Sequence, residues 1–224
     1  MMDTRADRKA ALYGAFALSG KALASGKRLE LLDLLAQGER SVDALARAAG
    51  LNLTTASAHL QTLKQAGFVT ARRDGTRIHY RLAGDDVAQL LSLLLKVAET
   101  HQAAVTPALQ DYLGSDSATE IDRAELQARA AAGDVVILDV RPAEEYAAGH
   151  IPGAISIPVD ELAERIGELP EDLEIVVYCR GEYCVFAYDA VRTLTEHGRR
   201  AIRLNDGMLE WRVAELPVDV TATA

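Results

Sequence analysis

Cysteine is scarce in this chain of 224 residues, which contains only Cys179 and Cys184. Two cysteines cannot form a disulfide framework, and in a reducing compartment thiols more often serve catalysis or redox chemistry than stapling. The sequence also lacks any apolar stretch near the roughly 20 residues that span a bilayer. Its Ala-rich segment near the start is interrupted by Gly and Lys and has no convincing cleavage site, which argues against a secretory signal. We therefore expect a cytoplasmic protein that does not enter a membrane.

Positive charge is also in short supply, because 24 Lys and Arg residues face 33 Asp and Glu residues. The imbalance lies in the second half: residues 1–114 hold 14 basic and 11 acidic side chains, whereas residues 115–224 hold 10 and 22. An acidic chain is a poor general match for nucleic acid, but phosphate contact depends on the local patch. Residues 64–81 form a basic patch in which Asp74 is the only acidic residue. The charge pattern thus leaves DNA binding open for the first half.

Helical periodicity dominates the first half. Three segments have apolar residues at helical spacing, and each ends at a glycine or one residue past it: 27–39, 41–50 and 52–67. The second segment begins with a serine suited to the N-cap position. Residues 68–83 then change to a strand pattern around a central Asp-Gly turn, which is typical of a β-hairpin. A long helical pattern follows over 85–113 and is expected to bend or restart near Pro107.

The second half alternates between strands and helices. Residues at the junction are small, polar and aperiodic, so we place a linker at 114–119 between domains at 1–113 and 120–224. Apolar strands are expected at 134–140, 154–158, 173–179 and 199–205, and helices at 122–133, 159–169 and 184–198. This alternation predicts an α/β domain with a mostly parallel sheet. The first domain is expected to be mainly α.

The two short helices at 41–50 and 52–67, followed by the basic hairpin, are typical of a winged helix-turn-helix. In that arrangement the second helix enters the major groove and the hairpin lies over the DNA backbone. Short polar side chains on the helix suit base edges, and arginines on the hairpin suit phosphates. The candidate DNA-binding residues are Thr54, Thr55, Ser57, His59, Gln61, Arg72, Arg73 and Arg77. For His59, a half-buried helix position competes with base reading.

The stretch LARAAGLNLTTASAHLQTLKQAGFVTARRDGTRIHYRL resembles the DNA-binding core of the ArsR/SmtB family of bacterial winged-helix repressors. The resemblance covers about residues 20–112 and includes a Ser-x-His-Leu step, although Ala58 stands where the family often has a second His. It implies a homodimer formed through residues 10–25 and 86–112. The two-fold symmetry of such a dimer implies a double-stranded, pseudo-palindromic DNA operator.

Many members of this family sense metals, through cysteines on the first helix of the motif or Asp and His residues on the last helix. Neither set is present here, because the first of these helices has no cysteine and the last has a lone His101. We therefore predict no metal site and no cofactor. The cysteine pair of persulfide-sensing relatives is also missing from these helices, so any thiol-based sensing must use the second half.

The segment VVYCRGEYC places both cysteines around a short loop. The preceding strand is expected to end at Tyr178 and the next helix to begin at Cys184 or Val185. Backbone amides of the loop and the positive end of the helix would then surround Cys179 and favour its thiolate form. Gly181 permits a tight curl because it has no Cβ.

This half resembles a rhodanese domain over about residues 117–217, through LDVRPAEEYAAGHIPGAISIP, the cysteine loop and DGMLEW in that order. The resemblance implies that Cys179 is the nucleophile. It would take sulfane sulfur from a donor such as thiosulfate or polysulfide, hold it as a persulfide, and pass it to an acceptor thiol. The persulfide would be cradled by the amides of Arg180, Gly181, Glu182, Tyr183 and Cys184, and the Arg180 side chain would attract an anionic donor.

Cys184 occupies a position where many single-domain rhodaneses have Arg. Two interpretations stay open: it resolves a Cys179 persulfide into a disulfide or polysulfur bridge, or it is a small buried residue at the helix start. A related phosphatase chemistry requires Cys-x5-Arg, and Val185 at the Arg position disfavours it.

Other polar residues of the α/β half are expected to be structural. Asp139 and Arg141 follow the first strand, where α/β sites cluster, and a salt bridge that supports the loop is favoured over a catalytic role. His150 is interpreted as a turn residue and the acidic PAEEY segment as a solvated helix face.

The leading hypothesis is a homodimeric transcriptional regulator, with repression favoured, whose DNA affinity changes when Cys179 is loaded with sulfur or oxidised. An alternative is a thiosulfate-type sulfurtransferase for which DNA binding is ancillary. A third is a degenerate rhodanese that serves only as an interaction module.

Overall fold

The structure, a computed structural model, describes residues 4–114 and 119–221. The chain divides into two compact units, Met1–Leu91 and Ser92–Ala224. The division falls inside helix α5 (Asp85–His101), whose second half groups with the C-terminal unit. Most of the predicted linker lies outside the described residues, so the predicted domain limits stay a prediction. None of the helices within the described ranges is both long enough and apolar enough to cross a membrane.

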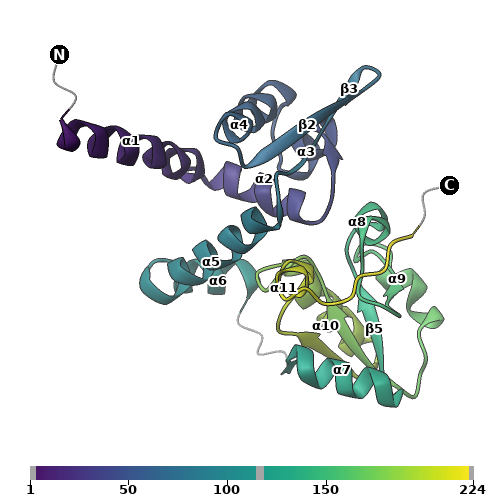
Figure 1. Cartoon of the computed structure of the whole chain (residues 1–224). Helices are drawn as coiled ribbons and strands as arrows, with labels where there is room; N and C mark the ends of the chain where they lie inside the picture. Colours follow the sequence, from purple (N-terminus) through teal and green to yellow (C-terminus); the bar gives the residue numbers. More distant parts are fainter. Residues whose placement is uncertain (1–3, 115–118, 222–224) are drawn as a thin grey trace. The chain divides into compact units, whose positions relative to one another are not determined.

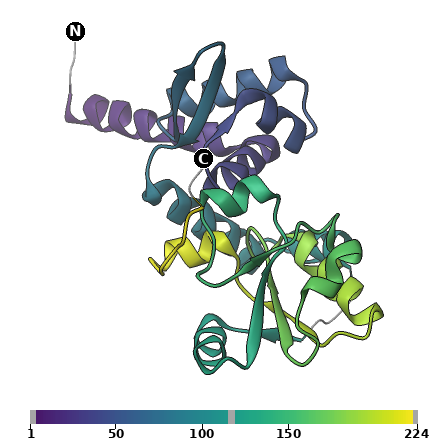
Figure 2. The same ribbon diagram turned by 90° about the vertical axis from the view of Figure 1, so that its right-hand side faces the viewer.

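The first unit consists of helices and a small antiparallel sheet (Figures 1 and 2). Its elements, ahead of α5, are α1 (Arg5–Leu23), α2 (Gly26–Ala36), β1 (Arg40–Ser41), α3 (Val42–Ala48), α4 (Leu53–Gln65), β2 (Val69–Asp74) and β3 (Arg77–Leu82). The strand order is β1-β3-β2. The predicted hairpin is present as β2 and β3, with Asp74 paired to Arg77 and Gly75 in the left-handed region at the turn.

Local sequence signals account for the helix-turn-helix. The hydroxyl of Ser41 accepts a hydrogen bond from the Ala44 amide at the start of α3, and Asn52 caps α4 in the same way. The side chains of Ala56, Leu60 and Leu63 are fully buried, as their spacing of three to four residues predicts for one helix face. The opposite, polar face of α4 is therefore left for solvent or a ligand.

The long helical pattern at 85–113 forms two helices. α5 ends at His101 and α6 (Val105–Leu113) starts after three intervening residues. Pro107 is the third residue of α6, within the first turn, where a missing amide N–H costs no intrahelical hydrogen bond. The predicted restart near Pro107 is thus confirmed, with the break just before the proline.

The second unit comprises the second half of α5, the whole of α6 and an α/β fold. Its further elements are β4 (Glu120–Ile121), α7 (Arg123–Ala132), β5 (Val135–Asp139), α8 (Ala143–Ala148), β6 (Ile155–Ser156), α9 (Leu162–Arg165), a 3-10 turn (Ile166–Glu168), β7 (Glu174–Tyr178), α10 (Val185–Glu196), β8 (Ala201–Leu204) and α11 (Met208–Val213). The five strands are all parallel in the order β4-β8-β7-β5-β6. The four predicted strands are present, and the two-residue β4 is an addition too short to give a sequence pattern.

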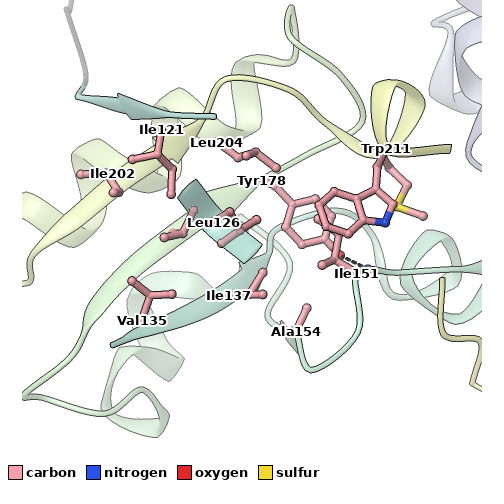
Figure 3. Packing of buried hydrophobic residues seen from close by; sticks show 12 residues of the cluster. Ile121, Leu126, Val135, Ile137, Ile151, Ala154, Tyr178, Ile202, Leu204 and Trp211 are labelled. Atoms are coloured by element: carbon pink, nitrogen blue, oxygen red, sulfur yellow. Dashed lines mark hydrogen bonds between the residues drawn. The ribbon is translucent and has the colours of Figure 1, made fainter. Parts of the chain in front are cut away.

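Alternation along β7 determines which layer each side chain enters. Tyr178 packs into a cluster with Leu126 of α7 and Trp211 of α11 (Figure 3). Val177 and Cys179 point to the opposite face, into a cluster with α10. Successive residues of a strand face opposite sides of a sheet. Cys179 is therefore directed to the α10 layer, at the carboxyl end of the central strand.

Candidate functional site

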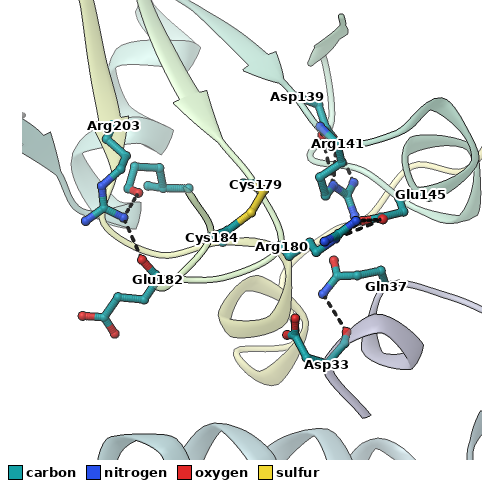
Figure 4. Close-up of a disulfide and its surroundings, with 12 residues drawn as sticks. Asp33, Gln37, Asp139, Arg141, Glu145, Cys179, Arg180, Glu182, Cys184 and Arg203 are labelled. Carbon is teal, nitrogen blue, oxygen red and sulfur yellow. Dashed lines mark hydrogen bonds and ion pairs between the residues drawn. A yellow bond between two sulfur atoms is a disulfide. The ribbon is translucent and has the colours of Figure 1, made fainter. Parts of the chain in front are cut away.

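Cys179 directly follows β7 and is 1% exposed. The carboxyl ends of parallel strands are where α/β folds bind ligands. Cys184 is the N-cap residue of α10, in agreement with the predicted helix start. The two sulfur atoms are joined in a disulfide whose Cα atoms lie 6.1 Å apart (Figure 4). The loop between them is thereby closed into a ring against the N-terminus of α10.

The disulfide bears on both interpretations of Cys184. Cys184 packs against the α10-side cluster, as a small apolar residue would, but its sulfur also reaches that of Cys179. In this form the Cys184 amide donates to the Gly181 carbonyl at 3.1 Å, so this member of the predicted amide cradle is engaged inside the loop. The catalytic roles assigned to the loop residues stay predictions. Among the described residues, no group of three or more His, Cys, Asp or Glu is placed to hold a metal.

The start of α11 supports the loop from outside. The amide of Met208 donates to the Cys179 carbonyl at 2.9 Å, and that of Leu209 donates to the Arg180 carbonyl at 2.8 Å. A Cβ placed on Gly207 would lie 2.3 Å from the Gly181 nitrogen, closer than real Cβ atoms approach. Glycine is therefore required at 207, at the start of the Gly-x-x-x-Trp segment, because two backbones touch there.

The expected salt bridge between Asp139 and Arg141 is present and completely buried. Arg141 binds the Asp139 carboxylate through Nε and Nη2, and Nη2 also donates to the Gly149 carbonyl at 2.8 Å. Tyr178 donates its hydroxyl to Asp139 and accepts from the Ile151 amide. Burial alone would lower the pKa of Arg141, but its hydrogen bonds to Asp139 and the Asp139 charge raise it. The pair holds the segment after β5 against the end of β7.

The PAEEY segment is only in part the solvated helix face that we expected. Its last four residues lie in α8, where Glu144 is exposed but Glu145 is 1% exposed. Its carboxylate accepts hydrogen bonds from Arg180 Nε at 3.0 Å and Nη2 at 2.6 Å (Figure 4). The Arg180 guanidinium, expected to attract an anionic donor, is therefore already bound to a carboxylate. Sequence pattern could not reveal this pair, because its members are 35 residues apart on different elements.

The loop contacts α5 through Tyr183, within the second compact unit. The Tyr183 hydroxyl donates to the Glu99 carboxylate at 2.6 Å. Burial first, then this hydrogen bond and the charge of Glu182, raise the pKa of Tyr183 far above its ordinary value. A cavity of about 520 Å³ adjoins the loop, and its lining includes Glu99, Glu182, Tyr183 and Tyr188. The sequence does not indicate this role of Glu99, because it shows only an acidic residue near the end of a predicted helix.

The predicted DNA-binding residues of the first unit lie on α4 and the hairpin. Thr54 and Gln61 are exposed, and Thr55, Ser57 and His59 are half-buried. Gln61 also donates to the Tyr80 hydroxyl at 2.9 Å, which ties α4 to β3. His59 thus occupies a half-buried helix position, which is the alternative to a role in base recognition given above.

The three hairpin arginines are exposed. Arg72 pairs with Glu39 and, at 3.2 Å, with Asp74, whereas Arg73 donates to the Gly75 carbonyl at 3.0 Å. Arg72 must therefore exchange its carboxylate partners for a phosphate if it contacts DNA. Exposed ion pairs are worth about 0–1 kcal/mol, so this exchange is inexpensive.

Comparison with known proteins assigns each half of the chain to a known domain type. The model of the bacterial regulatory protein, arsR family, matches residues 25–71, and that of the rhodanese-like domain matches residues 122–214. The HTH-type transcriptional regulator Rv0324 of Mycobacterium tuberculosis is 60% identical, over 97% of this chain and 96% of its own length. The chain belongs to the ArsR family. It is a transcriptional regulator with an N-terminal winged helix-turn-helix and a C-terminal rhodanese-like domain, as the sequence predicted.

Two further relatives match single halves of the regulator. A sulfurtransferase of Allochromatium vinosum is 35% identical over 44% of this chain and 92% of its own length. The solution structure of a homodimeric winged helix-turn-helix DNA-binding domain, Mb0332 from Mycobacterium bovis, is 59% identical with a TM-score of 0.42; the match covers 46% of this chain and 95% of that one.

Proposed function

We propose that this regulator binds a pseudo-palindromic operator as a homodimer and that sulfane sulfur taken up at Cys179 changes its DNA affinity. The observation that carries the proposal is the bond between Cys179 and Cys184 at the carboxyl end of the sheet. A second thiol within bonding reach of the nucleophile lets one sulfur-transfer event alter the covalent structure of the whole loop.

The chemistry proceeds in two displacements. The Cys179 thiolate attacks the outer sulfur of a persulfide donor RSSH, so that Cys179–S–SH forms and RS⁻ leaves. The Cys184 thiolate then attacks the Cys179 sulfur, and HS⁻ leaves as the Cys179–Cys184 disulfide forms. The sulfane sulfur is reduced to sulfide, the two thiols are oxidised, and no other oxidant is required.

Surface features of α1 and α4 support the DNA-binding and dimerisation parts of the proposal. The polar face of α4 and the exposed hairpin arginines offer donors for base edges and phosphates. On α1, Leu12, Tyr13 and Phe16 are 52–63% exposed, and their spacing places them together along one side of the helix. An apolar stripe of this kind is typical of an interaction surface, and it lies within the predicted dimer segment.

A binding assay with defined sulfur states tests the proposal. The full chain is first used to select an operator from a random double-stranded DNA library, and affinity is then measured by fluorescence anisotropy before and after polysulfide treatment. Allosteric coupling is typically about 1–3 kcal/mol, so we expect the affinity to change about 5- to 150-fold. Cys179→Ser should abolish the change.

Cys184→Ser separates the two displacements. This variant should take up one sulfur atom, seen by intact mass, but release no sulfide and form no disulfide. Equal DNA affinities for untreated and sulfur-treated wild-type protein would refute the proposed function.

The match to the Allochromatium vinosum sulfurtransferase favours a second candidate function, in which the rhodanese-like domain turns over sulfur as an enzyme. Repeated sulfur transfer to cyanide, measured as thiocyanate, would then depend on Cys179. Operator affinity would be the same for the untreated and the sulfur-treated protein.

A further inference from the structure

Both arginines that adjoin the cysteine loop are bound to carboxylates. Arg180 is paired with Glu145, whose side chain has no exposed surface, through hydrogen bonds of 2.6–3.0 Å. Arg203 donates to the Glu182 carbonyl at 3.3 Å and forms a salt bridge with Glu120. The positive charge expected at a site for a dianion is therefore compensated inside the domain.

Negative charge gathers on the outer side of the same loop. The cavity beside it is lined by three glutamates, Glu99, Glu120 and Glu182, together with Tyr183 and Tyr188. Glu182 lies inside the ring closed by the two cysteines. Burial, followed by the charge of Glu99, raises the pKa of Glu182 even though Arg203 opposes the shift. Because Glu120 is paired with Arg203, the net negative charge on this side of the loop comes from Glu99 and Glu182.

We propose that Cys179 selects a sulfur donor with at most one negative charge, such as an alkyl persulfide, and discriminates against the thiosulfate dianion. This inference rests on the proposed sulfur uptake and names its substrate class. With thiosulfate, the Cys179 thiolate would have to displace sulfite from the outer sulfur and leave Cys179–S–S⁻. That approach brings two negative charges toward the glutamate-lined loop, and repulsion between unit charges extends over about 8–10 Å at moderate salt.

Salt dependence of sulfur uptake tests the inference on the reduced full-length Cys184→Ser variant, in which the Cys179 persulfide is not converted to a disulfide. Addition of one sulfur atom is followed by intact mass with thiosulfate and with 2-hydroxyethyl persulfide, at low and high ionic strength, and free cysteine serves as the reference thiol. We expect the thiosulfate rate to rise with salt more steeply than for free cysteine, because screening weakens repulsion by the protein. The persulfide rate should follow the reference.

Charge removal provides the matched variants. Glu182→Gln should raise the thiosulfate rate roughly threefold and change the persulfide rate less, because the repulsion scales with donor charge. Glu125→Gln removes the same charge from an exposed position on α7, which covers the other face of the sheet, and should change neither rate.

The outcomes separate this inference from the proposed function. If thiosulfate uptake slows with added salt, or is unaffected by Glu182→Gln, the donor preference is wrong while sulfur uptake at Cys179 stands. If neither donor adds sulfur to the reduced Cys184→Ser variant, both the proposed function and the donor preference fail.

Discussion

Glu182 illustrates how a single charged side chain inside the cysteine ring can oppose folding. Its pKa is raised from an ordinary value of 4.5, first by burial and then by Glu99. A raised carboxyl pKa means that the folded state binds the proton more tightly than the unfolded state does. Tighter proton binding by Glu182 in the folded state stabilises the fold fully below the pKa that Glu182 has in the unfolded chain. This stabilisation is lost as pH rises through the higher pKa that Glu182 has in the folded protein. At neutral pH the ionised side chain therefore lowers the free energy of unfolding.

Glu182→Gln should accordingly raise the melting temperature of the rhodanese-like domain at about pH 7.5 and have little effect near pH 4. The chain has one tryptophan, Trp211, which is buried in this domain, so its fluorescence reports the domain's unfolding. A gain at pH 4 that equals the gain at pH 7.5 would contradict the assigned cause.

Gly207 is the residue at which two backbones come closest. A Cβ there would lie 2.3 Å from the nitrogen and 2.4 Å from the Cα of Gly181, and neither atom belongs to a flexible side chain that could move away. Gly207→Ala should cost about 2–4 kcal/mol of unfolding free energy, measured by urea titration of Trp211 fluorescence. Gly167→Ala is the matched control, because a Cβ there meets nothing within 4 Å. Equal midpoints for the two variants would contradict the close approach.

If sulfur is taken up at Cys179 as proposed, the contact between the loop and α5 is the element through which we expect the change to reach the rest of the chain. α5 contributes Asp85–Leu91 to the first compact unit and Ser92–His101 to the second. Tyr183, inside the cysteine ring, donates its hydroxyl to Glu99 near the end of that helix. Any change in the loop that moves Tyr183 therefore alters a hydrogen bond to α5.

Tyr183→Phe removes only the hydroxyl and should uncouple the two events. Sulfide release after polysulfide treatment should stay at the wild-type rate, whereas the change in operator affinity should fall below about twofold. Tyr188→Phe is the control, since its ring lines the same cavity and packs against Arg203 at 4.4 Å. A full wild-type response in Tyr183→Phe would exclude this hydrogen bond as the coupling element.

Most of the secondary structure followed the sequence because its signals are local, although no helix pattern was assigned to α1 or α11. Caps at Ser41 and Asn52, the Asp-Gly turn and the β7 apolar run each act within a few residues. The two-residue strands β1 and β4 escaped prediction, since a strand of that length has no period and exists only through pairing with β3 and β8.

For the whole molecule, we expect the proposed homodimer to form through the apolar stripe that α1 exposes in the single chain. Phe16→Asp places a charge in the stripe with Leu12 and Tyr13 and should convert a dimer to a monomer in light-scattering measurements. Operator affinity should fall at least tenfold, because a monomer contacts only one of the two half-sites of the operator. Ala11→Asp puts the same charge on the other side of α1 and should leave the dimer intact. A monomeric wild-type chain would refute the predicted homodimer.

The amino-acid sequence alone determined the two-domain class, the winged helix-turn-helix, the parallel sheet and Cys179 as the residue to examine. These follow from periodicity, caps, turns and short motifs, all of which are encoded over a few neighbouring residues. The partners of the loop were determined by tertiary structure: Glu145 on Arg180, Glu99 on Tyr183 and Gly207 against Gly181. Such contacts join residues 26–84 positions apart, and charge or hydrogen bonding at that separation leaves no local pattern to read. The charge at the cysteine loop is therefore set by folding, through a buried glutamate that the sequence pattern assigned to solvent.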